Sequence, residues 1–182
     1  DACGNPIADV EGTRGPVGTG GISSADSFRQ WFTDEPGVNI SANHAIELTR
    51  DMSGVYSYET DAFHPIDDRL FGNEGDAHNG YFTYEIATEF TYEPCQDQFV
   101  QFSGGDGAWL FIDGKLVMDL GGVRSGAGQY VDLDRIGLTG GQSYSMQIFY
   151  AQRDSLSSAF RLQTSVELSQ SGSSPAVTSM FD

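Results

Sequence analysis

Apolar and polar side chains alternate along much of the chain, which is the pattern of β-strands with one buried face. In residues 81–92 the large apolar side chains from Phe82 to Tyr92 occupy even positions, while most odd positions carry Thr or Glu. The same period of two recurs in residues 144–150 and 160–168, and residues 99–102 predict a shorter strand. The pattern therefore predicts a mainly β protein.

Residues 108–119 predict two strands joined by a tight turn. The dipeptide Asp113-Gly114 favours a two-residue hairpin, because both central positions of such a turn need a positive φ. We expect both faces of this hairpin to be largely buried, as in a central element of a sandwich. One face would carry Trp109, Phe111 and Val117, and the other Leu110, Ile112, Leu116 and Met118.

A single short helix is predicted near the start of the chain. Ser23 or Ser24 can cap it, and Phe28, Trp31 and Phe32 lie on one face at i, i+3 and i+4. Pro36-Gly37 ends the helical pattern. One helix followed by short strands and Gly-rich turns indicates an antiparallel β-sandwich of the lectin-like jelly-roll type.

The domain boundaries follow from changes in composition. Residues 1–22 are rich in Gly and poor in large apolar groups, so we interpret them as an N-terminal arm or linker. Residues 23–168 form the predicted sandwich, and the Ser-rich residues 169–182 are interpreted as a tail or linker. A chain of 182 residues suits one domain of this size.

The net charge of −17 excludes two classes of partner. Binding to nucleic acid or to an anionic membrane needs clustered basic residues, and this chain has only Lys115 and eight scattered arginines. The longest apolar runs are far shorter than the ~18 residues that a membrane span needs, so membrane insertion is not expected.

Catalysis is not expected either. Glu85 and Glu89 lie four residues apart on one predicted strand, about 13 Å at ~3.3 Å per residue, which is too far for a glycosidase pair. The three histidines, His44, His64 and His78, have no Gly-x-Ser-x-Gly nucleophile to serve. No zinc-protease, phosphate-loop or dinucleotide motif is present in the sequence.

Eight phrases of the sequence together resemble the fibro-slime domain. They are residues 21–32, 37–40, 63–68 (FHPIDD), 72–75, 82–85, 109–122 (WLFIDGKLVMDLGG), 148–153 (IFYAQR) and 158–161. The resemblance covers roughly residues 20–168 and implies a fold similar to the protective-antigen-type lectin sandwich of the PA-fourteen superfamily. It also implies an extracellular, multidomain setting, and several relatives bind sugars through calcium held by an Asp-cis-Asp loop.

The resemblance implies a pairing for the two cysteines. Cys3 and Cys95 are 92 residues apart and fit no metal-binding pattern, so the sequence alone leaves a disulfide and two free thiols open. Because the resemblance places the domain outside the cytosol, where disulfides persist, we predict a Cys3–Cys95 disulfide.

The resemblance also implies a loop end that binds ligands, and this chain departs from the family there. The family's acidic Gly-Asp-Asp-Asp reads Gly-Gly-Asp-Gly at residues 104–107, and the family's loop histidines are replaced by Arg124 and Asp154. We predict ligand binding by Asp106, Arg124, Arg153 and Asp154, with weak calcium binding or none, because the arginines offset the acids. The alternative is that Asp106 and Asp154, with backbone carbonyls, form a rebuilt calcium site.

The expected function is that of a non-catalytic recognition module in an exported bacterial surface protein, acting as an adhesin for a glycan or a surface protein. Arg124 and Arg153 would favour a carboxylated or sulfated partner. The alternative is a structural component of an extracellular matrix or surface fibre, with no small-molecule ligand. In both cases other domains of a larger surface protein are expected beside this one.

Overall fold

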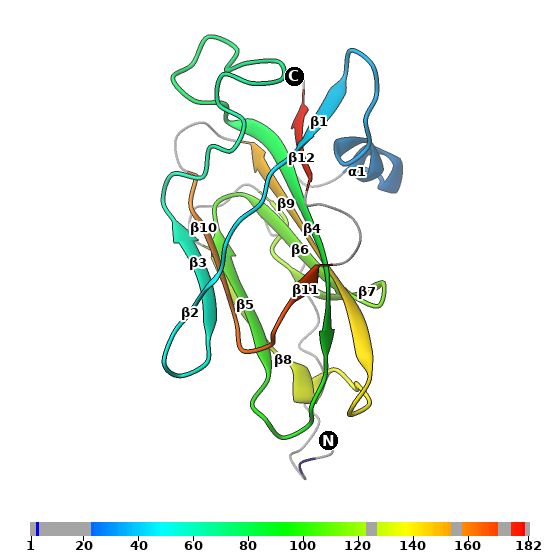
Figure 1. Cartoon of the computed structure of the whole chain (residues 1–182). Helices are drawn as coiled ribbons and strands as arrows, with labels where there is room; N and C mark the ends of the chain where they lie inside the picture. Colours follow the sequence, from blue (N-terminus) through cyan, green and yellow to red (C-terminus); the bar gives the residue numbers. More distant parts are fainter. Residues whose placement is uncertain (1–2, 4–22, 123–126, 154–157, 171–175, 181–182) are drawn as a thin grey trace.

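The structure, a computed structural model, is a sandwich of two antiparallel β-sheets with a short helix on the outside (Figure 1). It describes residues 3, 23–122, 127–153, 158–170 and 176–180. One sheet has the strand order β1-β12-β4-β9-β6-β7, with β11 also paired to β4, and the other has the order β2-β3-β10-β5-β8. This confirms the mainly β sandwich with one N-terminal helix that the sequence predicted.

The first sheet is built on two long central strands, β4 (Tyr81–Thr91) and β9 (Ser143–Arg153), which pair along their whole length. Its other strands are β1 (Asn39–Asn43), β6 (Gly107–Ile112), β7 (Lys115–Asp119), β11 (Ser169–Gln170) and β12 (Ala176–Met180). The second sheet consists of β2 (Thr49–Arg50), β3 (Tyr56–Thr60), β5 (Phe99–Gly104), β8 (Ala127–Asp132) and β10 (Phe160–Thr164). A 3-10 turn, η1 (Leu133–Arg135), follows β8.

The core lies between the sheets and is rich in aromatic rings. Phe102 and Phe160 of the second sheet contact Tyr150 of the first with ring centroids 5.9 and 5.3 Å apart. The even-numbered side chains Phe82, Tyr84, Ile86 and Phe90 of β4 are buried, as the alternation predicted. The period of two therefore identified the inward face of the central strand correctly.

The helix α1 (Ala25–Trp31) covers part of the outer face of the first sheet (Figure 1). Ser24 caps it by accepting a hydrogen bond from the Ser27 N–H at 3.0 Å. Phe28 lies edge-on to Trp109 at 5.0 Å, and Phe32 lies edge-on to Phe149 at 4.8 Å. The outer face of β6 is thus partly covered by the aromatic face of α1, and the capped helix confirms the sequence prediction.

The hairpin of β6 and β7 differs in part from its prediction. Asp113 and Gly114 both have positive φ, 46° and 73°, and Leu110 and Ile112 are buried in the core as expected. In β7, however, Val117 joins the core cluster and Leu116 is only half-buried, the reverse of the expected faces. The cause is a register shift after Leu110, which puts an extra residue into β7 and rotates its side chains.

Residues 169–182 also differ from the predicted tail. Two segments of this region, β11 and β12, pair with β4, and β12 also pairs with β1. Their sequences are short and contain Ser and Thr, so they carry little periodic signal. Pairing with neighbouring strands fixes such segments as strands, and β12 has a neighbour on each side. Of the predicted arm, residues 1–22, only Cys3 lies within the described residues.

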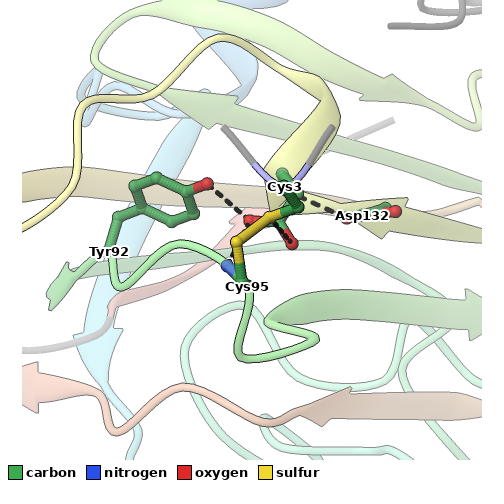
Figure 2. Close-up of a disulfide and its surroundings, with 5 residues drawn as sticks. Cys3, Tyr92, Cys95 and Asp132 are labelled. Carbon is green, nitrogen blue, oxygen red and sulfur yellow. Dashed lines mark hydrogen bonds between the residues drawn. A yellow bond between two sulfur atoms is a disulfide. The ribbon is translucent and has the colours of Figure 1, made fainter. Parts of the chain in front are cut away.

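The predicted disulfide between Cys3 and Cys95 is present, with Cα atoms 5.5 Å apart. Figure 2 shows it beside Tyr92, whose hydroxyl donates to Asp134, and the Cys95 N–H donates to the same carboxylate at 3.2 Å. Cys95 lies between the end of β4 and the start of β5. The disulfide therefore fixes the start of the chain at one end of the sandwich.

Candidate functional site

The opposite end of the sandwich holds Asp106 and Arg153, two of the residues that the sequence predicted to bind a ligand. Strand pairing places Tyr81 beside Arg153, and the start of β10 beside the end of β5, so these termini meet at one end. The turn at residues 104–107 and the segment 61–80 lie at this end too, the latter fixed by the Phe63 N–H, which donates to Ser158 O at 2.8 Å. We call these parts together the loop end, with segment 61–80 at the top of Figure 1.

Asp106 is a buried residue of the loop end. Only 4% of it is exposed, and its φ of 50° is in the left-handed region. Its carboxylate accepts the backbone N–H of Arg153 at 2.5 Å. The turn is tight as well, because a Cβ on Gly107 would lie 2.6 Å from the Trp109 ring. Asp106 therefore joins the β5–β6 turn to the end of β9.

Arg153 is held between an anion and an aromatic ring. Its guanidinium carbon lies 5.3 Å from the Trp31 ring centroid, within the range of a cation–π contact. Burial lowers the pKa of Arg153, whereas the negative charge of Asp106 acts to raise it. Since Arg153 comes from β9 and Trp31 from α1, the contact also ties the helix to the loop end.

The structure brings together two of the four residues predicted to bind a ligand. Asp106 and Arg153 are in contact through the Arg153 backbone N–H, and the negative charge of Asp106 acts on the Arg153 guanidinium. Ligand binding by these residues stays a prediction. Arg124 and Asp154 lie outside the described residues.

A second cluster at the loop end was not predicted as a site. One ligand atom each from His64, Asp67 and His78 lies within 4.8 Å of the others. The two imidazoles stack with centroids 4.1 Å apart and planes 8° from parallel, and Nδ1 of His78 lies 2.5 Å from an Asp67 oxygen. The sequence analysis considered His64 and His78 only as partners of a catalytic serine, and Asp67 only within the phrase FHPIDD. The H-x-x-D spacing of that phrase was the available signal.

Charge and burial in this cluster favour neutral His64 and ionised Asp67. Burial lowers the pKa of His64, and nearby His78 lowers it further, against the opposing charge of Asp67. For Asp67, burial raises the pKa, but hydrogen bonds from His78 and from the Asn79 N–H outweigh it, so the pKa is lower than usual.

Comparison with known families matches residues 34–179 to the PA14 domain. These residues include every strand from β1 to β11 and almost all of β12. The chain belongs to the PA14 domain family. The match confirms the protective-antigen-type resemblance stated from the sequence.

Curated relatives of this PA14 domain come from Dictyostelium discoideum. Protein psiQ is 38% identical over 166 residues, a match that covers 83% of this chain and 17% of psiQ. Protein psiR is 36% identical, with 80% and 16% covered, and protein psiD is 33% identical, with 80% and 30% covered. The chain thus spans less than a third of the length of these relatives, and they lend no support to the expected bacterial source.

The calcium site implied by the resemblance does not fit the described donors of this PA14 domain. Calcium takes six to eight oxygen ligands. The buried Asp106 carboxylate accepts a backbone N–H and faces a guanidinium, and no group of three or more acidic or His side chains gathers around it within the described residues. Asp154, the other predicted calcium ligand, is outside them. Weak calcium binding or none at this position therefore stays a prediction.

The part of the chain that the structure describes contains no helix long and apolar enough to cross a membrane.

Proposed function

We propose that this PA14 domain is a non-catalytic recognition module that binds a glycan or protein ligand at the loop end. Membership of the PA14 family supports the proposal, because the fibro-slime resemblance implies sugar-binding relatives of the same fold. Loops at one end of a rigid sandwich are also the usual place for binding residues. A role in adhesion is part of the proposal.

The observation that carries the proposal is the placement of Arg153. Its guanidinium is half-buried against Trp31, and its backbone is fixed by Asp106 at 2.5 Å. An arginine held in this way loses less conformational entropy on binding and can form charge-assisted bonds with a carboxylate or sulfate. We therefore propose a carboxylated or sulfated glycan, or an acidic protein segment, as the ligand.

The Cys3–Cys95 disulfide supports an extracellular location, since such bonds persist in oxidising compartments. The small share of each relative that the chain covers supports its being one domain of a larger surface protein. The rival proposal, a structural matrix component, predicts contacts between copies of the chain and no glycan ligand.

A glycan array probed with calcium or with a chelator tests the proposal. We expect binding to anionic glycans under both conditions, with Arg153→Gln weakening it on the order of tenfold or more, about one charge-assisted hydrogen bond. Arg50→Gln is the matched control. Arg50 also lies over an aromatic ring, Tyr56 at 5.6 Å, but at the opposite end of the second sheet.

Two outcomes would argue against the proposal. Equal losses in Arg153→Gln and Arg50→Gln would place binding elsewhere, provided that both variants keep the wild-type melting temperature. No glycan binding, together with concentration-dependent self-association, would favour the structural alternative.

A further inference from the structure

We propose that His64, Asp67 and His78 form a binding site for a divalent transition metal of the zinc type. Each residue offers one ligand atom, and these atoms lie within 4.8 Å of one another. The residues come from the two ends of segment 61–80, so the fold of that segment creates the cluster. The site is distinct from the Asp106–Arg153 pair and does not depend on the proposed function.

The chemistry of the donors selects the class of metal. Two imidazoles and one carboxylate suit zinc, copper or nickel, whereas calcium and magnesium prefer oxygen ligands alone. Three protein ligands would leave a fourth position of a tetrahedral zinc open to water or to another ligand. The net charge of −17 favours the approach of any cation.

The ligand atoms lie near the separations that one zinc requires, and the two rings must reorient to share the ion. Two nitrogens bound to one tetrahedral zinc lie roughly 3.4 Å apart, given Zn–N bonds of ~2.0–2.1 Å. The rings of His64 and His78 are stacked, with centroids 4.1 Å apart and planes 8° from parallel, so their nitrogen lone pairs are nearly parallel too. Binding to one zinc requires those lone pairs to converge, so at least one ring must turn about its side-chain torsions when the ion binds. The Asp67 oxygen lies 2.5 Å from Nδ1 of His78, a hydrogen-bond distance, so zinc would replace this bond and move the two atoms about 1 Å farther apart.

Hydrogen bonds around the cluster hold two of its members in place. The second oxygen of Asp67 accepts the Asn79 N–H at 2.8 Å. The Asn79 side chain is itself buried, donates to Gly72 O at 2.5 Å and accepts the Tyr81 N–H at 2.9 Å, at the start of β4. Asp67 and His78 are therefore anchored to the central strand. Such support around the ligands raises the affinity of metal sites.

The burial of a His64 nitrogen also supports a metal site. Nδ1 of His64 is buried and has no hydrogen-bond partner among the described residues, and a bound ion is one group that would satisfy such a nitrogen at this cluster. The other two side chains are accessible, since 51% of His78 and 26% of Asp67 are exposed. A metal can thus enter from solvent on the His78 side.

Calorimetric titration of the chelator-treated chain with zinc chloride tests the site. The buffer contains excess calcium, which occupies the exposed carboxylates of this acidic chain and so prevents zinc from binding to them. We expect one zinc per chain, and His78→Gln and Asp67→Asn should each weaken binding on the order of 10- to 100-fold or more. Asp76→Asn makes the same charge change at an exposed position of the same segment and should leave the zinc Kd unchanged.

Imidazole nitrogen resonances of the wild-type chain give a readout that needs no variant. Zinc should shift the signals of His64 and His78 and leave those of His44 in place. Equal zinc affinity in Asp67→Asn and Asp76→Asn, or the absence of shifts at His64 and His78, would overturn the proposal and leave an Asp–His hydrogen bond with stacked rings as the whole role of the cluster.

Discussion

At the scale of single residues, the loop end depends on polar side chains that are held by backbone groups. The buried Asp106 carboxylate accepts the Arg153 N–H at 2.5 Å. The Asn79 side chain donates to Gly72 O within segment 61–80 and accepts the Tyr81 N–H at the start of β4. Buried polar groups with such partners fix one local conformation, and removing one partner leaves the other unsatisfied. Asp106 is thus a structural residue of the loop end, whatever it binds.

Asp106→Ala tests this role. It removes the acceptor of the Arg153 N–H, so we expect a loss of about 1–3 kcal/mol in the free energy of unfolding. Urea denaturation with and without calcium measures it, and the loss should be the same in both. Two results together would contradict the prediction. The wild-type chain would bind calcium at micromolar concentration and Asp106→Ala would not, and in the chelator the two chains would have the same free energy of unfolding.

At the scale of the elements, the hairpin of β6 and β7 and the helix α1 depend on the sheet beneath them. A helix of seven residues has little stability of its own, and α1 contacts the sheet through Phe28 and Phe32. In the hairpin, the register shift after Leu110 turns Val117 into the core beside Met118, which pairs with Leu110. Within β6, Ile112 is buried in the core, whereas its neighbour Phe111 is half-buried on the outer face against Phe149.

This difference in depth predicts unequal effects of truncation. Ile112 is 2% exposed, and Ile112→Ala should cost on the order of 2–5 kcal/mol, since it leaves a cavity in the core. Phe111→Ala should cost less, because its ring is partly exposed on the outer face and keeps less area from water. Chemical denaturation of the two variants compares them directly. A larger loss in Phe111→Ala would mean that the outer aromatic face carries more of the hairpin's stability than the core.

At the scale of the whole molecule, the sandwich is secured by a disulfide at one end and carries the proposed binding groups at the other. The disulfide joins Cys3 to Cys95 near η1, where Asp134 accepts from both Tyr92 and the Cys95 N–H (Figure 2). The Asp106–Arg153 pair and the His64–Asp67–His78 cluster lie at the other end. We therefore expect a substitution at one end of the sandwich to leave the structure of the other end unchanged.

Removal of the disulfide tests that arrangement. The bond closes a loop across 92 residues, and its loss in Cys3→Ser with Cys95→Ser should cost roughly 4–5 kcal/mol in the chain-entropy model. Thermal denaturation of the double variant and of the reduced wild type measures the loss, and zinc titration should give an unchanged Kd while the chain stays folded. An equal melting temperature with and without the bond would show that the arm contributes nothing to stability.

The sequence by itself determined the parts of this protein that rest on local order. Alternation of apolar residues located β4, β9 and β10, and the Asp113-Gly114 dipeptide located the hairpin turn. The pair Ser23-Ser24 located the helix cap to within one residue, and the cap is Ser24. Each signal depends on a few neighbouring residues, so the sequence alone contains it.

Only the tertiary structure decided the rest, because it depends on which distant segments pair. The short strand β12 is fixed by pairing with β1 and β4, and the faces of β7 by a register shift against β6. Asp106 is buried because the end of β9 lies against its turn, and His64 meets His78 because segment 61–80 folds back on itself. Register and loop closure are long-range properties, and a periodic pattern does not contain them.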